Sequence, residues 1–165
     1  MPKTRKLALM AVFTAIALTI FMIEAQIPAP VPVPGVKLGL ANIITLIAML
    51  ILGRREAGAI LLMRIVMGAV FAGNMGALIY SLTGGVFAYI VMCVCTKVFP
   101  EKLLWVVSVL ASLAHNSGQL LACTLILKTP SLWVYAPVLA VSAIITGLFT
   151  GFAAMYLVRA LRKLG

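Results

Sequence analysis

Six long runs of apolar residues make up most of this 165-residue chain, and they constrain its fold more than any other feature. Basic residues, prolines and glycines separate the runs. A helix needs about 20 apolar residues to cross a bilayer, with a usual range of about 17 to 25. The runs lie at about 7–27, 37–53, 56–73, 76–96, 103–127 and 134–158. They predict an all-α integral membrane protein with six transmembrane helices, in a single domain that covers residues 1–165.

The composition excludes a soluble fold. Hydrophobic residues make up 64% of the chain and charged residues only 10%, whereas about 25% of an ordinary soluble domain is charged. A soluble protein of about 150 residues still exposes nearly a third of its chain surface to water. That surface could not be covered with so few polar residues, so a lipid environment is required.

The basic residues predict the orientation in the membrane. Cytoplasmic loops of membrane proteins carry an excess of Lys and Arg. If the N-terminus is cytoplasmic, ten basic residues fall on the inner side and two, Lys37 and Lys128, on the outer side. The bias predicts that both termini are cytoplasmic. The formal charge of +10 then reflects contact with anionic lipid headgroups, and we expect no nucleic-acid partner.

The acidic residues exclude several kinds of enzyme. The chain has three Glu and no Asp, so it has no Asp-rich magnesium motif, no aspartyl-phosphate site and no Walker-B Asp. It also lacks a GxxxxGK phosphate loop. One histidine cannot build a metal site, and the chain has no paired carboxylates for acid–base catalysis. We expect no catalysis and no cofactor in this chain, and any ATP would be hydrolysed by partner subunits.

Polar side chains within the runs gather at or beyond the expected midplane of the membrane. At 1.5 Å per helical residue, Arg64 lies about 13 Å beyond Arg55, and His115 lies about 20 Å beyond Lys102. Gln119 follows His115 by four residues and Asn116 by three, so the three share one flank of their helix. A polar pocket open to the outside is the simplest explanation. The candidate substrate-binding residues are Arg64, His115, Asn116, Gln119, Asn42, Lys37 and Glu24.

Structural roles are the alternative for each of these residues. Arg64 could form a bridge with Glu24, and His115 could be a neutral side chain satisfied by a neighbouring helix. Asn42 could join two helices by a hydrogen bond. Lys37 could be an interfacial anchor.

Residues 27–37, with the sequence IPAPVPVPGVK, form the first outer loop. Proline fixes its own φ angle and pushes the preceding residue toward extended geometry. Four prolines therefore predict a stiff, extended strap. It could cover the outer pocket or be a plain connector.

Small residues repeat near the cytoplasmic end of the first run, at Ala8, Ala11 and Ala15. Small faces allow two helices to approach closely in a membrane. Such spacing also arises by chance in an alanine-rich chain.

These features resemble the substrate-binding (S) components of energy-coupling factor (ECF) vitamin transporters. In that family an AxxxA face, here Ala11 and Ala15, contacts the transmembrane T subunit. The stretches PGVKLGLANI at 34–43, SLTGG at 81–85 and HNSGQLL at 115–121 more specifically resemble the Gx transporter family. Members of that family are often labelled heptaprenyl diphosphate synthase component I. The resemblance implies an S-component-like helix bundle in the bacterial cell membrane.

The resemblance implies uptake of a small anionic or polar metabolite, energised by a T subunit and two ATPase subunits. One alternative is a non-catalytic membrane subunit linked to polyprenyl diphosphate or quinone biosynthesis, or to flavin-based extracellular electron transfer. The other is a membrane enzyme that acts on a lipid diphosphate, which the absence of Asp disfavours.

Overall fold

A computed structural model describes residues 2–27, 37–73 and 75–163 of the chain. Within these ranges the structure contains six α-helices and two short 3-10 helices, and it has no strands, so the all-α prediction is confirmed. Residues 28–36 of the proline strap expected at 27–37 lie outside the described residues. The elements are α1 (Lys3–Glu24), α2 (Asn42–Ile51), α3 (Arg54–Phe71), α4 (Met75–Val98), η1 (Glu101–Leu103), α5 (Leu104–Leu127), η2 (Pro130–Tyr135) and α6 (Ala136–Lys163).

Four of these helices are long and apolar enough to cross a membrane, namely α1, α4, α5 and α6. The chain is therefore a multi-pass membrane protein. The other two helices are limited by length or by charge. Ten residues make α2 about 15 Å long, half of a bilayer core of about 30 Å. Helix α3 has 18 residues, but four of them are charged.

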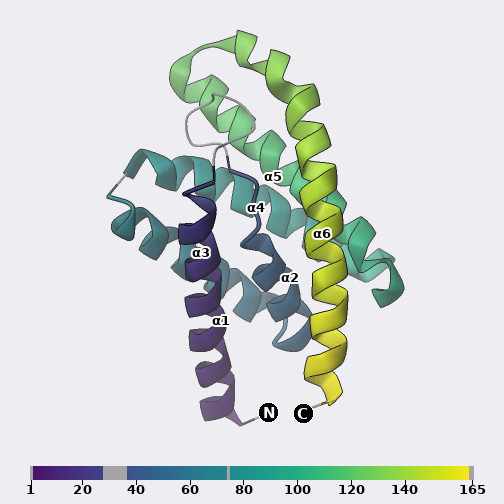
Figure 1. Ribbon diagram of the computed structural model, residues 1–165. Helices are drawn as coiled ribbons and strands as arrows, with labels where there is room; N and C mark the ends of the chain where they lie inside the picture. Colours follow the sequence, from purple (N-terminus) through teal and green to yellow (C-terminus); the bar gives the residue numbers. More distant parts are fainter. Residues whose placement is uncertain (1, 28–36, 74, 164–165) are drawn as a thin grey trace.

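Helix α2 lies inside the bundle (Figure 1) and contacts each of the other five α-helices. Most of its side chains are buried, including the run from Ile44 to Met49. A helix that is apolar on every side lies either in lipid or inside the protein, and here the other five α-helices surround it. Because its neighbours shield it from lipid, α2 does not need the length of a membrane span.

Helix α2 begins at Asn42, five residues later than the predicted start at 37. Gly39 has a φ of +78°, which is incompatible with a right-handed helix. The backbone N–H of the same glycine donates a hydrogen bond to the Glu24 carboxylate at the end of α1. Residues 37–41 therefore form a non-helical approach to α2, next to the polar side chains described below.

Helices α5 and α6 pack with almost no space between their backbones. A Cβ atom added to Gly147 would lie 2.6 Å from Val109 Cα, and one added to Gly151 would lie 2.5 Å from Trp105 Cα. The hydroxyls of Ser108 and Thr150 are hydrogen-bonded over 2.8 Å in the same contact. Glycines four residues apart, with a nearby hydroxyl pair, are typical of helix contacts in membranes.

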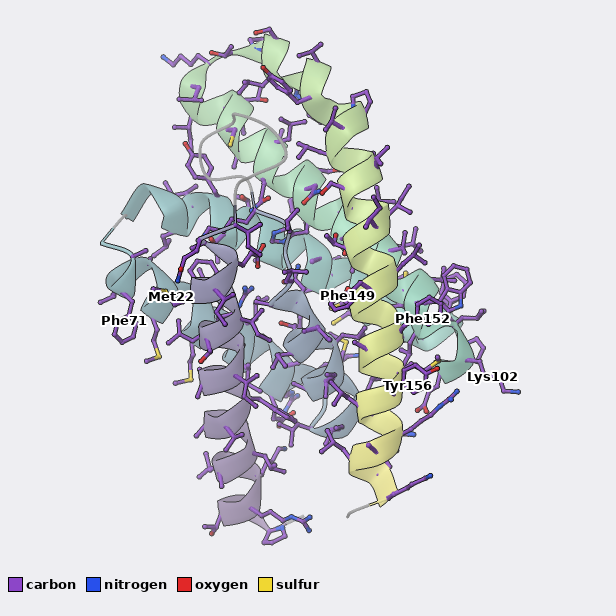
Figure 2. All side chains as sticks on the ribbon, in the orientation of Figure 1. Met22, Phe71, Lys102, Phe149, Phe152 and Tyr156 are labelled. Atoms are coloured by element: carbon purple, nitrogen blue, oxygen red, sulfur yellow. The ribbon has the colours of Figure 1, made fainter. Side chains whose placement is uncertain are left out.

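The outer surface of the bundle is rich in large apolar side chains. Figure 2 labels Phe71 at the end of α3 and Phe149, Phe152 and Tyr156 along α6, and all four side chains are exposed. Phe149 is 68% exposed and Tyr156 is 66% exposed. Exposed aromatic and aliphatic faces of this extent fit contact with lipid.

The N- and C-terminal ends of the chain lie at the same end of the molecule (Figure 1). Two ion pairs join segments that the distribution of basic residues assigns to one side of the membrane. Lys6 at the start of α1 pairs with Glu56 at the start of α3. Arg162 near the end of α6 pairs with Glu101 in η1, with 2.7 Å between Nη2 and Oε1.

Candidate functional site

A small polar cavity lies where α1, α3, α4 and α5 meet the approach to α2. Its acidic and basic side chains come from three different elements. Glu24 is in the last turn of α1, Lys37 is in the approach to α2, and Arg64 is in the second half of α3. The full lining comprises Phe21, Glu24, Lys37, Gly39, Arg64, Ser81, His115 and Gln119.

The cavity is small, and most of its polar lining side chains are deeply buried. Glu24, Arg64 and His115 are each 3% exposed, and Gln119 is 1% exposed. The free space amounts to about 10 Å³, which is room for about one water molecule. Charged groups this far inside a membrane protein are costly and are usually functional.

Hydrogen bonds fasten the approach to α2 over the cavity. The backbone N–H of Lys37 donates to Gln119 Oε1 over 3.1 Å. The backbone N–H of Gly39 donates to Glu24 Oε1. Two helices far apart in the sequence, α1 and α5, therefore hold the same short segment.

Arg64 lies in the cavity with little direct compensation for its charge. Its Nη2 atom is 3.4 Å from Asn42 Oδ1, a long contact with a neutral amide, and its Nε has no hydrogen-bond partner in the described ranges. Within the described part of the chain, the ion pairs within 4 Å are Lys6–Glu56 and Arg162–Glu101. Arg64 and Glu24 therefore line one cavity without forming the direct bridge that was one alternative.

Phe21 gathers the two cations of the cavity around its ring. Lys37 Nζ lies 3.6 Å from the ring centroid, and Arg64 Cζ lies 5.8 Å from it. The negative face of an aromatic ring attracts cations. Phe21 thus concentrates positive charge beside the cavity. The sequence gives no signal of this role, because Phe21 lies within an apolar run.

Within residues 2–27, 37–73 and 75–163, two further buried nitrogen atoms near Arg64 lack hydrogen-bond partners: Asn42 Nδ2 and His115 Nδ1. Buried polar atoms in proteins are nearly always paired with protein or water. Polar nitrogen atoms from α2, α3 and α5 therefore lie close together at the cavity. Asn42 is 5% exposed and lies beside the lining residues.

Glycines bring the surrounding backbone close to these side chains. A Cβ atom added to Gly39 would lie 2.9 Å from His115 Cδ2 and 3.1 Å from Asn42 Nδ2. One added to Gly84 of α4 would lie 2.7 Å from Gln119 Cγ. The approach to α2 and the face of α4 can therefore enclose the cavity only because these positions lack side chains.

Asn116 points away from the cavity. Its Nδ2 donates to the carbonyl of Leu139 on α6 over 2.9 Å. It lines a separate crevice of about 40 Å³ beside Trp133, between α5, η2 and α6. Of the three polar residues predicted to share a flank of α5, the structure brings His115 and Gln119 together and turns Asn116 toward α6.

The predicted partner-contact residues Ala11 and Ala15 are exposed on α1, as is Ala8. The buried face of α1 carries Phe13, Ala17 and Phe21, and it packs on α2 and α3. At 100° per residue the three alanines lie on the opposite side of the helix. This side of α1 is free to contact lipid or another protein.

Ser81 of α4 is a cavity residue that the sequence analysis did not single out. It lies in the SLTGG stretch used for the family resemblance, and depth in the membrane gives no reason to choose it.

No group of three His, Cys, Asp or Glu side chains in the described ranges is arranged to hold a metal ion.

Comparison with known proteins gives one match. The sequence model of a family described as Heptaprenyl diphosphate synthase component I matches residues 13–157, which include every lining residue of the cavity. No curated protein and no solved structure matches the chain.

Proposed function

The chain belongs to the heptaprenyl diphosphate synthase component I family, and from this premise we propose that it is the substrate-binding subunit of an ECF-type uptake transporter. In this proposal it lies in the bacterial cell membrane with six transmembrane helices and both termini in the cytoplasm. It captures a small anionic metabolite from outside. The chain itself catalyses no reaction and carries no cofactor.

The observation that carries the proposal is the buried Arg64, whose Nε has no hydrogen-bond partner among the residues that the structure describes. A guanidinium group enclosed in protein needs a carboxylate or phosphate partner with good geometry. The cavity supplies Lys37 and His115 beside it. The acidic group of a metabolite would accept a hydrogen bond from Arg64 Nε. Another acceptor atom of the metabolite would accept a hydrogen bond from Asn42 Nδ2.

The formal charges of the cavity favour one net negative charge on the metabolite. Arg64 and Lys37 contribute two positive charges, and Glu24 contributes one negative charge. Burying an uncompensated charge is costly, so a monoanion completes the balance with neutral His115. Glu24 would disfavour a dianion by repulsion.

Binding requires the cavity to enlarge, since about 10 Å³ cannot hold a metabolite. The approach to α2 is the natural moving part, because two hydrogen bonds to side chains hold it over the cavity. Opening would break the Lys37–Gln119 bond, and closure around a ligand would restore it.

Transport requires partners in this proposal. The exposed Ala11 and Ala15 on α1 would dock onto a T subunit, which carries two ATPase subunits. ATP hydrolysis there would tilt the bound subunit and expose the cavity to the cytoplasm. The absence of a phosphate-binding loop in the sequence agrees with this division of labour.

The test is purification from native membranes followed by mass spectrometry of retained small molecules. We expect a stoichiometric monoanionic metabolite. A chain that retains no small molecule, even after growth in rich medium, would contradict the proposal.

A second candidate function follows from the family description, which names a component of heptaprenyl diphosphate synthase. The chain would then be a non-catalytic membrane subunit for a polyprenyl diphosphate, quinone or flavin-based electron-transfer system. This candidate predicts co-purification with a prenyl or redox enzyme and an empty cavity.

A further inference from the structure

A second, larger cleft opens at the other end of α1, between the first turns of α1 and α3. Its volume is about 370 Å³, which is in the range of small-molecule sites. The cleft is open to the surroundings, and none of its lining residues belongs to the Arg64 cavity. Nothing in the proposed transport cycle uses it.

The polar rim of this cleft has an excess of positive charge. It carries Lys3 and Lys6 from α1, and Arg55 and Glu56 from α3. Lys6 pairs with Glu56, so the acidic side chain on the rim is already paired. Lys3 and Arg55 are exposed and form no ion pair within the part of the chain that the structure describes. Two cations thus remain for an anionic group.

The wall of the cleft is apolar. Leu7 and Met10 of α1 line it directly beyond the cations, and Leu7 is 66% exposed. The long apolar run of α1 also begins at Leu7, so the rim lies where the chain passes from charged to apolar residues. A ligand that matches both the basic rim and the apolar wall has an anionic group next to an apolar chain.

We propose that this cleft binds the headgroup of an anionic phospholipid. The phosphodiester lies between Lys3 and Arg55, and the first part of an acyl chain follows Leu7 and Met10. The lipid bridges α1 and α3 at an end where a partly buried ion pair, Lys6–Glu56, also joins them. Basic residues at a membrane surface each attract anionic lipid. This inference does not depend on the proposed transport function.

The experiment compares the full-length protein in detergent with phosphatidylglycerol and with phosphatidylcholine. Native mass spectrometry measures bound lipid, and the thermal unfolding midpoint measures stabilisation. We expect phosphatidylglycerol to bind and to raise the midpoint. K3Q/R55Q should weaken this binding by about 30-fold, since two cations contact the phosphate. The charge-preserving variant K3R/R55K should retain it.

The matched control is K97Q/K102Q, which removes the same charge from two exposed residues outside the cleft. It should leave phosphatidylglycerol binding unchanged. Equal losses in both variants, or equal binding of phosphatidylcholine, would overturn the proposal. Stabilisation by inorganic phosphate that equals the effect of phosphatidylglycerol would overturn the assignment to a lipid and indicate a site for free anions.

Discussion

The backbone N–H of Lys37 donates to the side-chain oxygen of Gln119 over 3.1 Å, across 82 positions of the sequence. This bond fastens a non-helical segment to the middle of α5, beside an arginine that has no direct ionic partner. A hydrogen bond between protein groups contributes only about 1 kcal/mol net to stability, because its partners would otherwise bond to water. The segment can therefore separate from Gln119 with only a small loss of free energy.

Arg64→Met should abolish retention of the metabolite without unfolding the protein. The substitution removes a buried charge whose hydrogen bond is a long one to a neutral amide, and it keeps an apolar side chain of similar length. A charged hydrogen bond is worth about 1.5–3 kcal/mol, so retention should fall by about tenfold or more. Mass spectrometry of the purified protein measures retention, and the thermal midpoint should change little.

Arg159→Met is the control for this variant, because Arg159 is exposed on α6. It should leave retention intact. Unchanged retention in Arg64→Met together with a large loss of stability would instead make Arg64 a structural residue.

Gly39→Ala should destabilise the protein by about 1–3 kcal/mol. The new Cβ would meet His115 and Asn42 at 2.9 and 3.1 Å, and alanine would be strained at a φ of +78°. Chemical unfolding measures the loss. Gly73→Ala is the matched control, since its φ is +60° but nothing lies within 4 Å of the added atom. Equal losses in the two variants would show that backbone strain, and not crowding against the cavity, sets the cost.

Much of the helical architecture could be predicted from the sequence. The ends of α4 and α5 lie within two residues of the predicted runs, because charges and prolines end these helices. The start of α2 could not be placed, since a run of apolar residues conceals the non-helical conformation of Gly39. The sequence also could not show that α2 is surrounded by protein, because hydropathy is the same for a lipid-facing and a buried apolar helix.

The candidate site residues were predicted from their depth in the membrane. Depth does not determine which side of a helix a residue lies on. Glu24, Lys37, Arg64, His115 and Gln119 do line one cavity. Asn116 lies at the same level as His115 but 100° further round the helix, which turns it to α6. Whether the lining residues bind a metabolite stays a prediction.

Gly151→Ala should destabilise the packing of α5 against α6. The added Cβ would lie 2.5 Å from the Cα of Trp105, so the helices would have to separate. Overpacking of this kind costs about 1–3 kcal/mol. Gly58→Ala is the comparison, because its Cβ would meet the hydroxyl end of Tyr89 at 3.2 Å, and a side chain can move. The thermal midpoint should fall for Gly151→Ala and change little for Gly58→Ala.

The double variant A11L/A15L separates binding from transport. Both alanines are exposed and lie opposite the face of α1 that packs on α2 and α3. Leucine at these positions therefore disturbs no internal contact, and the thermal midpoint and metabolite retention should stay as in the wild type. A close contact with another helix would be lost, because bulky side chains hold the two backbones apart. Uptake into cells should fail, and so should co-purification with a T subunit.

Ala160→Leu is the control for this variant, since Ala160 is an exposed alanine on a different helix, α6. It should support normal uptake. If A11L/A15L also transported normally, the exposed face of α1 would contact only lipid, and the partner would have to dock elsewhere. If A11L/A15L lost metabolite retention as well, α1 would act on the cavity itself through Glu24 and Phe21, which the same helix carries at its other end.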